Sequence, residues 1–265
     1  MTMTAGYNLS LTTSPNLRTE TLMRLTEEKK DLSDLRKDLN KGSTTISHSL
    51  RELEENKLIH QDAEKYYSLT NIGKIMANGV IDLNDTMETL YKFESFWLAH
   101  DLSAVPDQLL DKLGQLKDSR IISGTPVLVF KAYETVINLL KDAKEVKVVS
   151  SILIPDITLL FDMLVAEKDM RIILTEDALY PSIEEVGLER VSKAIEKNFK
   201  LHMLKQNLKI GFFTVTDRFM ALVPYRLDGV FDWSSDLISC NKTAIDWGLA
   251  LFNHCNELSE SVDLS

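Results

Sequence analysis

The sequence predicts an α+β chain made of an N-terminal winged helix-turn-helix, a helical connector and a C-terminal α/β domain with a mixed sheet. We expect these parts at residues 1–80, 81–120 and 121–265. Helical spacing of apolar residues, followed by two short alternating runs, predicts the first part. A long apolar stripe predicts the connector. Alternation of β-branched runs with helical patterns predicts the last part.

Apolar residues recur at helical spacing three times within the first 56 residues. Leu17, Leu22 and Leu25 mark the first helix, and a turn at 40–42 separates the second helix from the third. Three helices and then a hairpin form the order of a winged helix. The expected elements are helices at 15–26, 31–38 and 43–56, strands at 58–61 and 65–69, and a short helix that 70–73 caps and that ends at about Met76 or Ala77.

The connector keeps a helical pattern over residues 82–116, and one stripe of that pattern is apolar. The stretch 101–106 interrupts the pattern, and Pro106 is well placed at the start of a helix. Such a stripe packs into a core or forms the seam of a dimer, and the pattern leaves both interpretations open. The stripe consists of Leu83, Met87, Leu90, Phe93, Phe96 and Trp97.

Short β-branched runs alternate with helical patterns after residue 121 and then give way to closely spaced strands. This order predicts a mixed sheet, because strand-helix alternation favours parallel pairing and a meander favours antiparallel pairing. We expect the last two strands to form a hairpin that turns at 216–218. The expected strands are 146–150, 170–175, 199–204, 209–215 and 219–225, and the expected helices are 154–166, 182–195 and 242–258.

The net charge of −10 is unevenly distributed. Residues 1–75 hold 11 basic and 11 acidic side chains, whereas the remainder holds 19 basic and 29 acidic ones. An acidic protein repels nucleic acid as a whole, but a neutral N-terminal part permits a local DNA-binding surface.

Targeting and cysteine patterns place the chain among cytoplasmic proteins. No apolar run approaches the ~18 residues that a membrane span needs, and no basic segment leads into a long apolar stretch at the start. The two cysteines, Cys240 and Cys255, form no Cys-x-x-Cys pair. We therefore expect two free thiols, with neither a disulfide framework nor a zinc site, and we expect no membrane partner.

The segment that begins at Ser43 carries the strongest functional signal. Ile46, Leu50 and Leu53 fall on one helical face, and the opposite face carries hydroxyls, an imidazole and a guanidinium. Such groups hydrogen-bond base edges and phosphates, and free N–H groups at a helix start favour phosphate. Taken alone, the same pattern also fits a capped, solvated surface helix. With the hairpin behind it, the segment predicts contact with double-stranded DNA through Lys41, Ser43, Thr44, Thr45, Ser47, His48 and Arg51.

The expected hairpin corresponds to the wing. Lys65, Tyr66 and Tyr67 lie near its tip, where they can touch the sugar-phosphate backbone. Because alternate strand residues face inward, one of the two tyrosines is expected in the core. Lys65 and Tyr67 complete the set of predicted DNA-binding residues.

Several motifs resemble those of known regulators. The blocks 45–47, 53–59 and 67–73 resemble the ArsR-like winged helices of archaeal regulators. Lys57 stands where that pattern has a glycine, so we expect Asn56 to take the left-handed position that ends the helix. The segments 96–106, 227–237 and 244–252 resemble the methanogenesis-regulator (filamentation-regulator) family of methanogenic archaea. This resemblance implies a dimeric transcription regulator with a sensory or assembly domain, and it implies no catalytic residues.

Enzymatic signatures are weak in the second half. The resemblance extends to phospholipase D-like domains, which need His-x-Lys, but here Lys205 comes one position too late after His202. No Walker loop, Gly-x-Ser-x-Gly or His-Glu-x-x-His is present. We therefore expect no enzyme, cofactor or metal. A scaffold with a degenerate phospholipase D-like domain and no DNA binding is the alternative.

A small-molecule effector site is a further expectation for the α/β domain. Ligands of such folds bind at the carboxyl ends of the strands, where polar side chains are expected here. Ordinary loop capping by the same residue types is the competing interpretation. The candidate residues are Ser150, Ser151, Thr175 and Asp228.

Overall fold

The computed structural model describes residues 17–124, 131–165, 168–205 and 208–264. The chain divides into two compact units, Met1–Asp85 and Thr86–Ser265. Helix α4 (Asn71–Lys92) begins in the first unit and ends in the second. Each unit has a hydrophobic core of its own.

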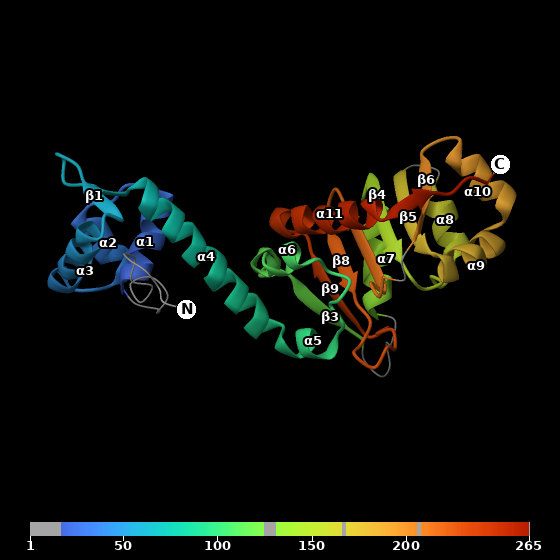
Figure 1. Ribbon diagram of the computed structural model, residues 1–265, viewed down its shortest axis with the longest axis horizontal. Coiled ribbons are helices and arrows are strands. Elements are labelled where there is room, and N and C mark those ends of the chain that lie inside the picture. The colour runs from blue at the N-terminus through green and yellow to red at the C-terminus, as the bar shows by residue number, and fades with distance from the viewer. Residues whose placement is uncertain (1–16, 125–130, 166–167, 206–207, 265) are drawn as a thin grey trace. The chain divides into compact units, whose positions relative to one another are not determined.

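The first unit is the expected winged helix (Figure 1). Its elements are α1 (Leu17–Glu27), α2 (Leu32–Leu39), α3 (Ser43–Glu55) and an antiparallel hairpin of β1 (Ile59–Gln61) and β2 (Tyr67–Leu69). Asp31 begins α2 with a capping box, in which its side chain accepts from the N–H of Asp34. The three helices converge on a core whose fully buried members include Leu22, Leu35, Ile46, Leu50 and Leu53.

The junction between α3 and β1 differs from the sequence-based expectation by one residue. Asn56 has φ −83°, and Lys57 takes the left-handed conformation with φ 61°. The N–H of Leu58 donates to the Leu53 carbonyl at 2.9 Å, and the N–H of Lys57 donates to the Glu54 carbonyl at 2.8 Å. This pair of bonds defines a Schellman motif, which requires the left-handed residue directly after the cap. The expectation for Asn56 was therefore wrong, and Lys57 adopts the conformation that a glycine favours.

The start of α4 packs very closely against the α3–β1 junction. Thr70 caps the helix by accepting from the N–H of Gly73 at 3.0 Å, and its hydroxyl donates to the Lys57 carbonyl at 2.6 Å. A Cβ at Gly73 would lie 1.7 Å from the Leu58 carbonyl oxygen, so only glycine fits there. The sequence predicted a short helix that ends near Ala77, but α4 continues without a break for 22 residues. Ala77 and Val80 are buried, and their spacing extends the helical pattern past the expected end.

The second unit contains an eight-stranded mixed sheet with the order β10-β6-β5-β4-β7-β8-β9-β3. The pairs β4–β5 and β5–β6 are parallel, and the remaining neighbours are antiparallel, as expected for a mixed sheet. The strands are β3 (Arg120–Ser123), β4 (Glu145–Ser150), β5 (Asp169–Thr175), β6 (Phe199–Leu204), β7 (Phe212–Thr216), β8 (Met220–Val223), β9 (Ser235–Ser239) and β10 (Ser259–Ser261).

Helices cover both faces of this sheet (Figure 1). Alternation along β4 illustrates the division, since Val148 belongs to one core and Val149 to the other. The core around Val149 is covered by α5 (Glu94–Ala99), α6 (Asp107–Leu110), the 3₁₀ helix η2 (Leu113–Leu116) and α11 (Lys242–Glu257). The core around Val148 is covered by α7 (Lys131–Lys141), α8 (Ile157–Val165), α9 (Glu176–Val186) and α10 (Leu188–Ile195).

The connector contributes to the core of the second unit. Phe93 and Phe96 are buried there, and Lys92 anchors the end of α4 by donating to the Lys117 carbonyl at 2.7 Å. The Trp247 indole donates to the Leu109 carbonyl at 2.9 Å, which ties α11 to α6. Pro106 is the cap before α6. The apolar stripe of the predicted connector is thus divided. Phe93 and Phe96 at its C-terminal end are buried in the core, whereas its residues on α4 are exposed.

Several boundaries in the second unit differ from the predicted ones. The expected helix 182–195 is two helices, α9 and α10, separated at Gly187 with φ 97°. The sequence reading missed α7, β3, β9 and β10. The hairpin between β7 and β8 turns where predicted, with the Thr216 hydroxyl accepting from the N–H groups of Arg218 and Phe219. No helix in the described ranges is long and apolar enough to cross a membrane.

Lys57→Gly should stabilise the protein, because glycine adopts positive φ without the steric cost that lysine carries. We expect the free energy of unfolding to rise by about 0.5–1 kcal/mol after the greater entropy of the unfolded glycine is subtracted. Urea denaturation followed by circular dichroism measures the change. Lys57→Ala is the matched control, since it removes the same charge and keeps a Cβ. A gain of equal size in both variants would show that backbone strain is not the cause.

Candidate nucleic-acid interface

Helix α3 presents one polar face to solvent and buries the other. Ile46, Leu50 and Leu53 are at most 1% exposed. The side chains expected to contact DNA on this helix are exposed, namely Thr44, Thr45, Ser47, His48 and Arg51, and Ser43 is half-buried. The helix therefore displays hydroxyl, imidazole and guanidinium groups along one surface, with the chemistry needed to hydrogen-bond base edges.

The start of α3 lacks a side-chain cap. Its N-cap residue is Gly42, in an extended conformation, which has no side chain to cap the first turn. Asn40 takes the left-handed conformation and turns the chain between α2 and α3, which leaves Lys41 exposed beside the helix start. Uncapped N–H groups carry partial positive charge and attract an anion such as phosphate.

Carboxylates gather at the other end of α3. Glu52 accepts from Arg18 at 2.9 Å and lies 3.5 Å from His48. The Arg51 guanidinium lies 3.8 Å from Glu55, and both side chains are about two-thirds exposed. An exposed pair of this kind contributes less than ~1 kcal/mol, so Arg51 can exchange Glu55 for another acceptor. The carboxylates therefore make the last turn of α3 acidic, whereas the exposed polar face extends from Thr44 to Arg51.

The wing is stabilised by a carboxylate at its turn. Asp62 accepts from the N–H of Tyr66 at 2.9 Å and from that of Glu64 at 3.0 Å. The bond from Tyr66 and the ion pair with Lys29 hold the pKa of Asp62 below its ordinary value. Lys65 has φ 70° at this turn and is exposed.

The two tyrosines of the wing have different surroundings. Tyr67 is half-buried against the core of the first unit, and its backbone pairs with Lys30 through bonds of 2.8 and 3.1 Å. Burial, followed by the charge of Glu54, raises the pKa of the Tyr67 hydroxyl. The Tyr66 ring lies 4.8 Å from the Lys29 ammonium. Lys29, which the sequence reading missed, thus adds a cation beside the wing.

Three of the expected effector residues lie at the carboxyl ends of strands and Asp228 lies in the loop between β8 and β9, and most of them are occupied by hydrogen bonds. The Ser150 hydroxyl donates to the Ile152 carbonyl at 2.9 Å, and that of Ser151 donates to the Gly211 carbonyl at 3.3 Å. Asp228 is exposed and accepts from the N–H of Val230 at 3.0 Å. Thr175 is buried, and its hydroxyl has no partner within the described ranges. The bonds of Ser150 and Asp228 to residues two positions further along the chain are typical of loop capping, whereas the Ser151 bond joins two distant segments.

The two residues of the degenerate phospholipase D-like motif, His202 and Lys205, do not share a partner among the residues that the structure describes. Lys205 pairs with Glu260 at 2.9 Å, whereas the His202 ring contacts the Ser259 hydroxyl at 3.2 Å. The two residues of the degenerate motif therefore have separate partners. Across the described ranges, no group of three or more His, Cys, Asp and Glu side chains is placed to hold a metal ion.

Comparison with known proteins identifies the family. Residues 8–88 match the N-terminal domain, and residues 129–258 the middle domain, of "Methanogenesis regulatory protein FilR1". The chain is 30% identical over 261 residues to the protein of that name from Methanothrix harundinacea (strain 6Ac). The chain belongs to the FilR1 family. The match covers 94% of this FilR1-family chain. The chain spans only 57% of the length of that relative.

Solved structures resemble the FilR1-family chain more distantly. One is TrmBL2, an archaeal chromatin protein, at 12% identity with a TM-score of 0.43, covering 93% of this chain and 94% of that one. Another is the phospholipase D family member Nuc from Salmonella typhimurium, at 13% identity with a TM-score of 0.40, covering 54% of this chain and 98% of that one.

A buried acid cluster joins the connector to the closing motif of this FilR1-family chain. The His100 ring lies 2.7 Å from the Phe96 carbonyl through Nδ1 and 3.1 Å from Asp232 through Nε2. Although burial opposes it, hydrogen bonds from Ser234 and His100 lower the pKa of Asp232. Burial, and then the charge of Asp232, raises the pKa of Asp236 to about 7. Two of the three segments that predicted the family from sequence, 96–106 and 227–237, are therefore in contact.

The raised pKa of Asp236 makes stability depend on pH. The unfolded chain releases this proton near pH 3.8 and the folded chain near pH 7, so the free energy of unfolding falls as the pH rises through that range. Asp236→Asn keeps the shape of the neutral acid without its charge. We expect this variant to exceed the wild type by an amount on the order of 2–4 kcal/mol at pH 8 and by much less at pH 5. Denaturant unfolding at both values measures the difference, and a pH-independent difference would contradict it.

Proposed function

We propose that this chain is a sequence-specific regulator of transcription that binds double-stranded DNA as a homodimer. The observation that carries the proposal is the exposed polar face of α3, from Thr44 to Arg51, behind an uncapped helix start. The membership in a family of regulatory proteins supports it. The neutral charge of residues 1–75 removes the electrostatic objection that an acidic protein raises.

The geometry of the winged helix gives each group a role. Helix α3 would lie in the major groove with its exposed face, from Thr44 to Arg51, toward the bases, so that Arg51 can pair with the O6 and N7 atoms of guanine. Thr44, Ser47 and His48 would contact bases or adjacent phosphates. Lys41 would anchor the helix start to a phosphate, and Lys65 would do the same for the wing.

The exposed face of α4 supports a homodimer. Five apolar side chains lie within about a third of its circumference at 100° per residue, and each is between 38% and 73% exposed. A second copy of the same helix would remove these side chains from water, and its two-fold symmetry would match a pseudo-palindromic DNA site. We define this seam by Ile72, Ile75, Leu83, Met87 and Leu90.

We assign residues 1–80 to DNA binding, 81–120 to dimerisation and 121–265 to regulation, with Ile72 and Ile75 extending the dimer seam into the first part. The large sheet of the second unit would serve as a sensory or assembly domain. The alternative scaffold without DNA binding differs in one measurable respect. Only neutralisation of phosphates makes duplex affinity fall steeply with salt concentration.

Arg51→Ala tests the proposed base contact. The protein first selects its preferred duplex from a random pool, and fluorescence anisotropy then measures affinity for the selected and for a scrambled duplex. We expect a loss of about 1–3 kcal/mol on the selected duplex and a much smaller loss on the scrambled one. Lys41→Ala should weaken both duplexes alike and lower the salt slope by about one.

Lys112→Ala is the matched control, because it removes one exposed positive charge from the second unit. Its affinity should equal that of the wild type. Equal losses for Arg51→Ala and Lys112→Ala would remove α3 from the interface, and a wild-type protein with no salt-dependent binding would favour the scaffold.

Leu83→Glu tests the seam on α4. A carboxylate in the centre of an apolar contact loses its hydration, so we expect the variant to be monomeric at concentrations where the wild type is dimeric. Sedimentation equilibrium measures the mass. Asn84→Glu places the same charge on the adjacent exposed residue outside the seam, and it should remain dimeric. A dimeric Leu83→Glu variant would place the dimer contact elsewhere.

A further inference from the structure

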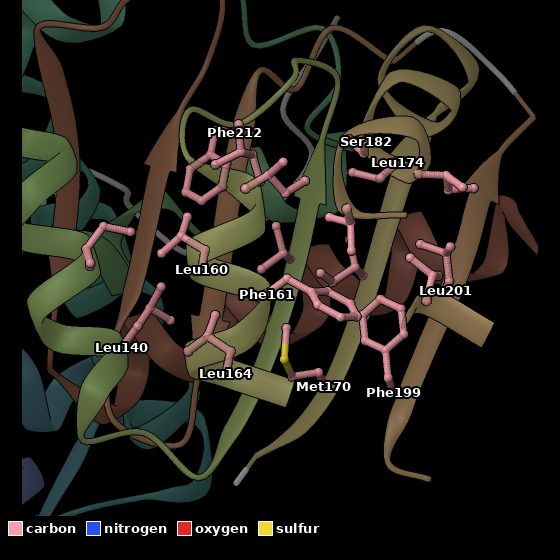
Figure 2. Close-up of a pocket in the computed structure, with 18 of the residues that line it drawn as sticks. Leu140, Leu160, Phe161, Leu164, Met170, Leu174, Ser182, Phe199, Leu201 and Phe212 are labelled. Atoms are coloured by element: carbon pink, nitrogen blue, oxygen red, sulfur yellow. The ribbon is translucent and has the colours of Figure 1, made fainter. Parts of the chain in front are cut away.

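The second unit contains an apolar cavity between its sheet and the helices α7, α8 and α9 (Figure 2). Its volume is about 70 Å³. Side chains from strands β4, β5 and β6 form its floor, and Figure 2 shows residues of the sheet and the helices converging on the same space. Its walls include Leu140, Leu160, Leu164, Met170, Leu174 and Leu201.

The described residues that line the cavity offer no free polar atom. Tyr133 and Ser182 are the lining residues with hydroxyl groups, and both donate to backbone carbonyls at 2.6 Å, those of Pro155 and Ala178. A buried water needs two to four polar partners, which this lining does not supply. Water is therefore a poor occupant, although the volume exceeds the roughly 10–15 Å³ that one water needs.

Two aromatic rings pack against each other in the lining of the cavity. The rings of Phe161 and Phe199 meet edge to face with centroids 5.5 Å apart. This contact fixes the distance between α8 and β6, because close-packed rings cannot move further into the space between them. The cavity is thus a consequence of the way α8 is held above the sheet.

Helix α8 forms a wall that can give access to the cavity. It supplies four lining side chains from a helix of nine residues, and its outer side carries Leu159, which is 70% exposed. Polar contacts to α9 and α10 are few in the described ranges, among them the bond from the Thr158 hydroxyl to the Glu185 carbonyl at 3.1 Å and the ion pair of Asp162 with Arg190. A short helix held in this way needs little displacement to admit a small molecule.

We propose that this cavity binds a compact, uncharged apolar molecule, from a few carbon atoms up to a single aromatic ring. A charged or hydrogen-bonding ligand would lose its hydration without finding a partner, which excludes polar effectors from this site. The volume is about half of an engineered apolar cavity of ~150 Å³ that binds benzene or xenon, so a single aromatic ring is the upper size and requires a displacement of α8. Its role as an effector site rests on the proposed regulatory function, whereas the binding itself does not.

Xenon and benzene are the probes for this site. We expect either probe, added to the full chain without DNA, to shift the methyl NMR signals of Leu140, Leu164, Met170 and Leu201. Signals of Leu251, in the core on the other face of the sheet, should stay unchanged. Absence of shifts at saturating probe, or shifts spread over both cores, would overturn the proposal.

Variants of two adjacent valines distinguish binding inside the cavity from non-specific binding of an apolar molecule elsewhere on the protein. Val148 lines the cavity, and Val149 packs on the opposite face of the same strand. Val148→Leu and Val148→Phe fill the space step by step, so benzene affinity should fall by at least about tenfold along the series. Val149→Leu should leave benzene affinity unchanged. Equal affinity in the wild type and Val148→Phe would overturn the site. If a variant fails to fold, the localisation of shifts in the wild type still decides the question.

DNA affinity is measured separately, with and without benzene. A protein that binds the probe but no duplex would refute the proposed function and leave the cavity site intact. A protein that binds duplex but no probe would refute the cavity site alone.

Discussion

The burial of one face of α3 against α1 and α2 is the constraint on which the first unit depends. Ile46, Leu50 and Leu53 fix the rotation of the helix about its own axis, since turning it by one residue would bury a hydroxyl and expose a leucine. The same rotation determines which side chains face solvent. A hydrophobic interaction therefore specifies a polar surface that has no contact with it.

Sequence periodicity predicted the elements whose burial follows a regular pattern. The three helices and the hairpin of the first unit were predicted because each has a continuous apolar stripe or alternation. Shorter elements escaped, since β10 has three residues with no buried side chain and β3 has none fully buried. Lys57 shows another limit. Its left-handed conformation is imposed by the Schellman bonds, although a lysine carries no local preference for it.

The candidate interface was predictable only where it follows from the periodic spacing of residues. The exposed face of α3 follows from residue spacing alone, whereas its ion pairs depend on contacts between distant segments, such as Arg18 with Glu52. Lys29 joins the wing from a loop more than 30 residues away, which no spacing rule detects. The raised pKa of Asp236 likewise requires knowledge of burial, because an aspartate between a serine and a leucine looks ordinary in sequence.

The two edges of the large sheet have a consequence for assembly. At one edge β10 is only three residues long and carries the Glu260–Lys205 ion pair, and at the other the four-residue β3 begins with exposed Arg120. Short, charged border strands make poor templates for strand addition, so sheets from neighbouring molecules have little to join. The eight-stranded layer is thereby protected against open-ended fibrous growth.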